Sequence, residues 1–230
     1  IPLAGPIAGA HPSSPTAAGG AADKKNALRA IVALRINPAT APGPATLRFN
    51  GRDVATAILA EAPPQVVIVV DTTSAVHLDG WTRISNLGRE VASAAVLEAA
   101  KSLASMLVTE SAGVPFEDSL LATEGACDLI TGLLPRAPSL KTVLQGATVM
   151  LESAFGGRVP LQSAWGDGPT PVARRSFPAD AAARSLQVPI LLQPQHLALE
   201  RLLQAAGLAL QDVTRALAEA TGDHSAPARL

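Results

Sequence analysis

The pattern of apolar positions divides the chain into a strand-rich first part and a helix-rich remainder. Residues 27–36 and 45–49 have the composition of strands, and residues 65–71 (QVVIVVD) contain five consecutive β-branched residues. A continuous apolar run of this kind is typical of a strand that is buried on both faces. We therefore expect residues 65–71 to form a buried strand within a small sheet.

The segment between the second and third predicted strands fits two structures. Asn50-Gly51 is a strong tight-turn signal, and a hairpin there would place Arg48 across from Asp53. Alternatively, Asp53 caps a helix that runs through Val54 and Ile58. The four-residue spacing of these two apolar residues and the nearby alanines favour the helix. A strand, a helix and a buried strand in succession predict a βαβ unit.

From about residue 82 onward the apolar residues recur at helical spacing. The longest predicted helix covers about 88–108, and its apolar side is predicted to carry Val91, Ala95, Ala99, Leu103 and Leu107. Further helices are predicted at 116–134, 138–155, 195–206 and 209–221, with a short apolar run at 188–192. The fold class that follows is α/β (or α+β), with a small sheet packed by Ala/Leu-rich helices that dominate the C-terminal two-thirds.

Composition shifts suggest the domain boundaries. Residues 1–26 form an Ala/Pro/Gly-rich segment, predicted to be an extended arm that contacts a neighbour through Ile1, Pro2, Leu3 and Ile7. Residues 27–222 are expected to make one globular domain, with a possible sub-boundary in the Pro/Gly-rich stretch 156–178. Residues 223–230 are expected to be a loose tail.

The apolar residues are of an unusual kind, because the chain has 45 alanines and 30 leucines against four Phe, two Trp and no Tyr. This composition favours close aliphatic packing over aromatic binding pockets. The 18 basic and 19 acidic residues nearly balance, and no dense basic patch occurs, so nucleic acid is not expected as a partner.

Two further features of the sequence bear on membrane insertion and on the cellular compartment. The most apolar helical stretch, residues 91–109, carries Glu98 and Lys101 at its centre, so we do not expect it to span a membrane. A single cysteine, Cys127, fits a cytoplasm-like reducing compartment or a particle-associated protein without requiring either.

The clearest candidate for chemistry is the sequence DTTSAVHLD at 71–79. Ligands bind at the carboxyl ends of strands in open α/β sheets, and Asp71 follows the most apolar predicted strand directly. Asp71 and Thr73 could hold Mg²⁺, with Asp79 nearby, and His77 with Asp79 could orient a general base. The alternative is that Asp71 and Thr73 cap the strand and turn it into a loop.

Other catalytic templates are not matched by the sequence. It contains no GxGxxG, no GxxxxGK[ST] and no GxSxG. Residues 199–220 have helix-turn-helix spacing around Gly207, but the second helix offers one cation, Arg215, so we interpret the segment as a plain helical hairpin.

Two hypotheses about function follow. The first is a non-catalytic structural subunit of a larger assembly, such as a capsid or phage tail, that binds protein partners or copies of itself and needs no cofactor. The second is an α/β enzyme or ligand-binding domain with a Mg²⁺ or phosphate site built on Asp71, Thr72, Thr73 and Asp79.

Overall fold

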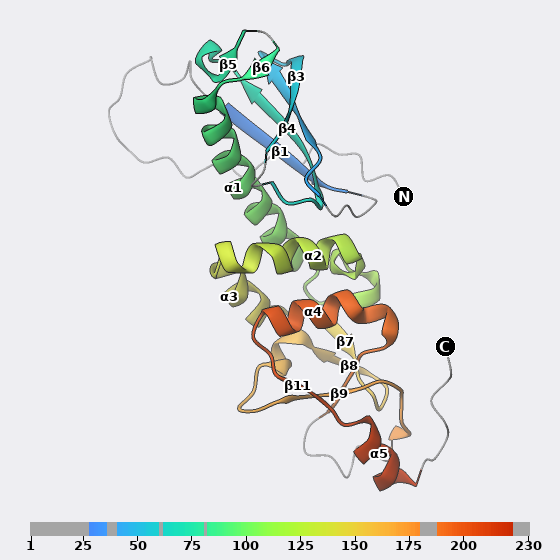
Figure 1. Cartoon of the computed structure of the whole chain (residues 1–230). Helices are drawn as coiled ribbons and strands as arrows, with labels where there is room; N and C mark the ends of the chain where they lie inside the picture. The colour runs from blue at the N-terminus through green and yellow to red at the C-terminus, as the bar shows by residue number, and fades with distance from the viewer. Residues whose placement is uncertain (1–27, 36–40, 60–61, 81, 180–187, 223–230) are drawn as a thin grey trace. The chain divides into compact units, whose positions relative to one another are not determined.

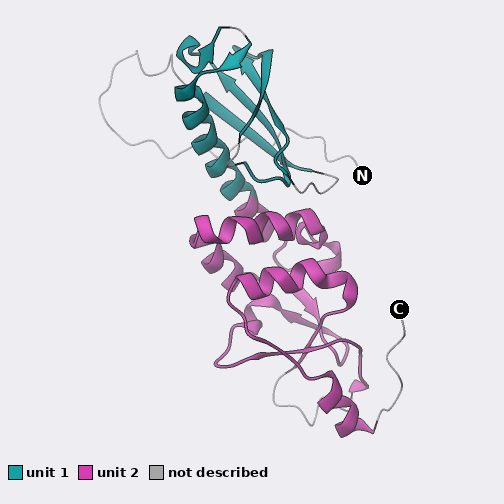
Figure 2. Ribbon diagram, viewed as in Figure 1, with its two compact units in different colours: residues 1–103 teal, residues 104–230 magenta. Residues whose placement is uncertain are grey.

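The computed structural model describes residues 28–35, 41–59, 62–80, 82–179 and 188–222. The chain divides into two compact units, residues 1–103 and 104–230 (Figure 2). The boundaries predicted above for an arm, one domain and a tail stay a prediction, since compactness alone does not show which parts fold independently. The arm and the tail lie outside the described residues.

The first unit is built on a four-stranded sheet (Figure 1). Its strands are β1 (Leu28–Leu34), β2 (Pro44–Phe49), β3 (Arg52–Ile58) and β4 (Val66–Thr72), in the order β1-β4-β2-β3. β4 pairs antiparallel with β1 and parallel with β2, and β2 pairs antiparallel with β3. The three strands predicted from the sequence are confirmed, and β3 is the strand that the prediction missed.

The predicted helix after Asp53 is wrong, and so is the βαβ unit. A hairpin forms instead, turning at Asn50 (φ 51°) and Gly51 (φ 79°), both in the left-handed region that a type I′ turn requires. Arg48 lies opposite Asp53, and its Nε donates to Asp53 Oδ1 at 2.6 Å. The cross-strand ladder with β2 outweighs the weak helical spacing of two apolar residues.

The expectation that β4 is buried on both faces is also wrong. Val66, Ile68 and Val70 are at most 2% exposed, whereas Val67 between them is 50% exposed. The alternation follows from the layering, because helix α1 (Asn86–Glu110) lies along one face of the sheet (Figure 1). Runs of β-branched residues occur in strands that are covered on one face as well as in strands covered on both, so the sequence pattern alone does not distinguish these two environments.

Helix α1 confirms the longest predicted helix. Ser85 Oγ accepts a hydrogen bond from Gly88 N at 3.0 Å, which satisfies one of the free amides of the first turn. Its buried stripe contains Ala92, Val96 and Ala100, one position beyond the predicted Val91, Ala95 and Ala99, and then Leu103 and Leu107 as predicted. Between Ser85 and β4 the chain forms a short pair, β5 (Leu78–Asp79) and β6 (Arg83–Ile84).

Among the described helices, α1 alone is long and apolar enough to cross a membrane by length and composition. Of its most apolar 18-residue window, 39% is buried within the structure. Lys101 Nζ and Glu98 Oε1 pair at 2.7 Å on the exposed side. The prediction that this helix does not span a membrane stays a prediction.

The second unit combines helices with small sheets. Its helices are α2 (Glu124–Leu133), α3 (Ser139–Gln145), α4 (Leu197–Ala205) and α5 (Thr214–Thr221). Its strands are β7 (Met150–Glu152), β8 (Arg158–Pro160), β9 (Thr170–Ala173), β10 (Ile190–Leu191) and β11 (Leu210–Asp212). β9 is the centre of a parallel sheet of order β10-β9-β11, while β7 and β8 pair antiparallel. Helices α2 and α4 pack side by side through fully buried leucines that include Leu129 and Leu203 (Figure 1).

Several predicted helices of this unit are shorter than expected. Residues 116–134 begin with two 3-10 turns, Phe116–Asp118 and Leu120–Ala122, before α2 starts. Residues 138–155 contain α3 and then β7, because the helix ends at Gly146 and the following ATVML is rich in strand formers. Residues Leu210–Asp212 form β11 rather than part of a helix, so the predicted helical hairpin is also wrong. The mixed α and β class is confirmed, in its α+β form.

Candidate functional site

Asp71, the centre of the predicted metal site, supports the hairpin turn. Its Oδ1 accepts a hydrogen bond from Gly51 N at 3.0 Å, which ties the end of β4 to the turn between β2 and β3. In the sheet register Asp71 also lies directly opposite Arg29 on β1 and Arg48 on β2. This hydrogen bond gives the carboxylate a structural role in holding the turn between β2 and β3.

The buried polar pair of this loop is one that the sequence analysis did not single out. Thr72 Oγ1 lies 2.6 Å from His77 Nδ1, and the two residues are 4% and 6% exposed. Thr72 Oγ1 also accepts from Ser74 N at 3.1 Å. A hydroxyl beside an imidazole is the arrangement of a nucleophile and its base, but both groups are enclosed, so a substrate would have no access to them here. The pair fixes the loop.

The remaining residues of the predicted site are placed differently. Asp79 lies on β5 opposite Arg83, on the exposed side of the short β5–β6 pair. The backbone carbonyl of His77 accepts from Ser85 N at 2.9 Å and lies so close to Gly88 that a Cβ there would overlap it. Within the described residues, no group of three or more His, Cys, Asp and Glu side chains is placed to hold a metal ion. The Mg²⁺ hypothesis thus rests on Asp71 and Thr73 alone.

A small cavity of about 230 Å³ lies in the second unit, between the segment that precedes α2 and the start of α4. Phe116 and His196 line it, with ring centroids 5.8 Å apart in an edge-to-face arrangement. The Nδ1 atom of His196 is buried and has no hydrogen-bond partner among the described residues, although the residue as a whole is only partly buried. Cys127 also lines the cavity, and burial raises the pKa of its thiol to about 12, so it is not a nucleophile at neutral pH.

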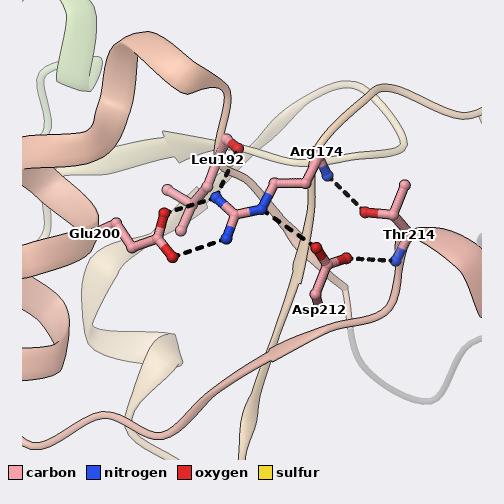
Figure 3. A network of polar contacts seen from close by, with 5 residues as sticks. All are labelled: Arg174, Leu192, Glu200, Asp212 and Thr214. Carbon is pink, nitrogen blue, oxygen red and sulfur yellow. Dashed lines mark hydrogen bonds and ion pairs between the residues drawn. The ribbon is translucent and has the colours of Figure 1, made fainter. Parts of the chain in front are cut away.

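A polar network of the second unit is centred on Arg174, at the carboxyl end of β9 (Figure 3). Its guanidinium binds Glu200 of α4 through two hydrogen bonds of 2.6 and 2.7 Å, and its Nε donates to Asp212 at 3.3 Å. Its backbone N donates to Thr214 Oγ1 at 2.8 Å, and Asp212 Oδ1 accepts from Thr214 N at 2.9 Å. The network therefore joins β9 to α4, to the end of β11 and to the start of α5.

Within this network, Arg174 and Glu200 each favour the charged form of the other. The hydrogen bonds from Arg174 hold the pKa of Glu200 below its usual range and raise the pKa of the guanidinium. Two carboxylates surround one cation, which leaves no unpaired positive charge to recruit an anionic ligand. Sequence reasoning passed over Arg174 because its partners lie 26 and 38 positions further along the chain.

Among the described residues of the first unit, exposed aliphatic side chains gather on the face of the sheet opposite α1, here called the open face. By register it contains the residues of the four strands that point away from the helix: Arg29, Ile31, Ala33, Pro44, Thr46, Arg48, Asp53, Thr56, Ile58, Val67, Val69 and Asp71. Three large aliphatic side chains on it are about half exposed: Ile31 at 51%, Ile58 at 53% and Val67 at 50%. Exposed aliphatic groups that gather on one face of a sheet are typical of interaction surfaces.

Charges on the open face form one ordered row. Arg29, Asp71 and Arg48 are directly opposite one another on β1, β4 and β2, and Asp53 follows on β3. The signs alternate across the sheet, so the face is neutral as well as apolar. No protein-family model matches this chain, and no curated protein matches it significantly.

Proposed function

We propose that this chain is a non-catalytic subunit of a larger protein assembly, of the kind found in capsids or phage tails, and that it binds neighbouring proteins through aliphatic surfaces. The observation that carries this proposal is the open face, where Ile31, Ile58 and Val67 each leave about half of their surface in water. Covering the exposed half of one such side chain stabilises a complex by about 1 kcal/mol.

Charge supports the same proposal. A net charge of −1 on 230 residues produces little repulsion between copies or neighbours. The alternating charges of Arg29, Asp71, Arg48 and Asp53 would let a partner approach the open face without meeting a field of one sign. Residues 1–26 and their apolar side chains Ile1, Leu3 and Ile7 belong to this proposal as a second contact, although they lie outside the described residues.

The rival proposal, an enzyme or ligand-binding domain with Mg²⁺ or phosphate at the end of β4, has weaker support. Its central carboxylate, Asp71, already accepts a hydrogen bond from Gly51 N. Thermal unfolding with and without Mg²⁺ separates the two proposals, because a bound cation raises the melting temperature of the folded chain.

The direct test of the assembly proposal is the molar mass of the purified full chain, measured by size-exclusion chromatography with light scattering over a range of concentrations. The proposal predicts a multiple of the 23.4 kDa chain mass. Deletion of residues 1–26 would then show whether the arm contributes: if it does, the number of chains in each particle falls while the circular dichroism spectrum of the folded part stays unchanged. A monomer at every concentration would overturn the proposal.

A further inference from the structure

We infer that the partner is a second copy of this chain, joined by antiparallel pairing of β1 with β1 of the other copy so that Ile31 faces Ile31. This inference rests on the proposed function and names its partner. The joined sheet would have eight strands, and the open faces of both copies would lie on the same side of it.

The two edges of the sheet differ in how they are protected. β3, at one edge, begins with the charged pair Arg52-Asp53, and its pairing with β2 is interrupted by a register shift at Leu47/Arg48. β1, at the other edge, keeps an unbroken register over seven residues and contains neither proline nor glycine. An edge strand that is regular and apolar is a template for pairing with another strand, whereas bulges and charges prevent such pairing.

The ladder with β4 shows which backbone groups of β1 remain available. Arg35 N donates to Gln65 O at 2.8 Å, and these residues continue the register of Leu34 with Val66. Directly opposite residues of an antiparallel ladder alternate between hydrogen-bonded and non-bonded pairs, so the odd-numbered residues of β1 bond to β4. The N–H and C=O groups of the even-numbered residues point away from β4, and none of the described strands lies beyond them. These residues are Leu28, Ala30, Val32 and Leu34.

One register between two copies uses all of these groups. With Ile31 opposite Ile31, each copy pairs Ala30 with Val32 and Leu28 with Leu34, and about eight hydrogen bonds can form. The even-numbered side chains then stay on the side covered by α1 and the odd-numbered ones on the open face, as in the single chain. A shift by one residue would reverse the faces, and a shift by two would shorten the overlap.

Charge and side-chain contacts favour the same register. It places Arg29 opposite Ala33 of the second copy, so the two arginines do not confront each other, and each keeps Asp71 opposite it within its own sheet. The two Ile31 side chains, each 51% exposed, would meet at the two-fold axis beside Val69. The aliphatic part of the open face then becomes continuous across the dimer.

The experiment that tests this pairing is oxidative cross-linking of I31C in the full chain. A non-bonded antiparallel pair brings the two Cα atoms to about 4.5 Å, within the range that a disulfide spans. We expect a covalent dimer on a non-reducing gel at low protein concentration. V76C is the matched control, because Val76 is 60% exposed in the same unit but lies off the strand edge. The native Cys127 is buried and does not compete.

A second pair of variants tests the register without oxidation. I31K and I31E each place like charges at the two-fold axis, so each is expected to be a monomer by light scattering, and an equimolar mixture is expected to form a heterodimer. V76K is expected to leave the wild-type mass unchanged. Because residue 31 is exposed, these substitutions leave the core of the single chain intact.

The outcomes separate this inference from the proposed function. An oligomeric wild type in which I31C does not cross-link, and in which the charged variants do not complement each other, overturns the β1 pairing and leaves the proposed function standing. A monomeric wild type overturns both. If I31C cross-links only after residues 1–26 are deleted, the chain's own arm occupies the edge, and that result also overturns the inference.

Discussion

Removal of Arg174 is expected to destabilise the second unit by about 2 kcal/mol. The guanidinium makes two hydrogen bonds of 2.6 and 2.7 Å to Glu200 and a longer one of 3.3 Å to Asp212. An exposed ion pair contributes at most about 1 kcal/mol, and breaking a fully buried one costs about 3–5 kcal/mol. The Arg174 and Glu200 side chains are 38% and 16% exposed, so the cost for R174A lies between these limits.

The assay is urea unfolding followed by the fluorescence of Trp165, in a W81F background so that the second unit alone reports. R174A is expected to lower the urea midpoint without changing the slope, which indicates a change in stability rather than in compactness. R201A is the matched control, since Arg201 binds Glu124 and Asp128 at the surface, and we expect a smaller loss for it. A change for R174A no larger than that for R201A would refute the reasoning.

The pH dependence of the stability that Glu200 contributes follows from the direction of its pKa shift. Arg174 holds the pKa of Glu200 below its usual range in the folded chain. A carboxyl group with a lowered folded pKa stabilises the fold above its unfolded pKa of about 4.3, and this contribution is lost as the pH falls through the folded value. The stability difference between wild type and E200Q should therefore be full at pH 7 and shrink below about pH 4. A difference that is constant from pH 7 to pH 3 would contradict this account.

Three further predictions concern the remaining sites. D71A is expected to lower the free energy of unfolding by about 1 kcal/mol through loss of the turn hydrogen bond, whereas D79A at the surface should lower it less. Mg²⁺ is expected to leave the melting temperature of the wild type unchanged. A rise in melting temperature with Mg²⁺ that D71A abolishes would restore the metal hypothesis. G88A is expected to destabilise the fold by more than about 1 kcal/mol, because a Cβ there meets the backbone carbonyl of His77. G132A, near the end of α2 where no atom lies within reach of an added Cβ, should stabilise the fold by about 0.5–1 kcal/mol. Thermal unfolding measures both changes. Cys127 is expected to react with a thiol reagent at pH 8 only in denaturant, and rapid labelling of the folded chain would show that its cavity opens.

The sequence predicted local features better than their pairing. The apolar run ending at Asp71 and the long helix after Ser85 were correctly located, because the first has a β-branched pattern and the second a strong helical period. The hairpin at Asn50-Gly51 was considered but ranked below a helix, because the residues of β3 alone do not reveal that pairing with β2 stabilises a strand there. Short strands such as β11 were missed because three residues carry too little pattern.

The candidate site shows the same division. The sequence directed attention to Asp71 and His77 as candidate metal-binding and catalytic residues, whereas the partners that the structure gives them, Gly51 N and Thr72 Oγ1, depend on how the loop folds. The open face could not be predicted, because β4 has apolar residues on both sides and only the position of α1 determines which side stays uncovered. The Arg174 network joins distant segments, which composition and spacing do not reveal.

The central claim is that aliphatic surfaces of this chain bind protein neighbours, and the molar mass of the full chain in solution tests it most directly. Light scattering coupled to size-exclusion chromatography is predicted to give a multiple of 23.4 kDa that falls towards one chain mass on dilution or in I31K. A constant mass of 23.4 kDa from the lowest to the highest soluble concentration would contradict the claim.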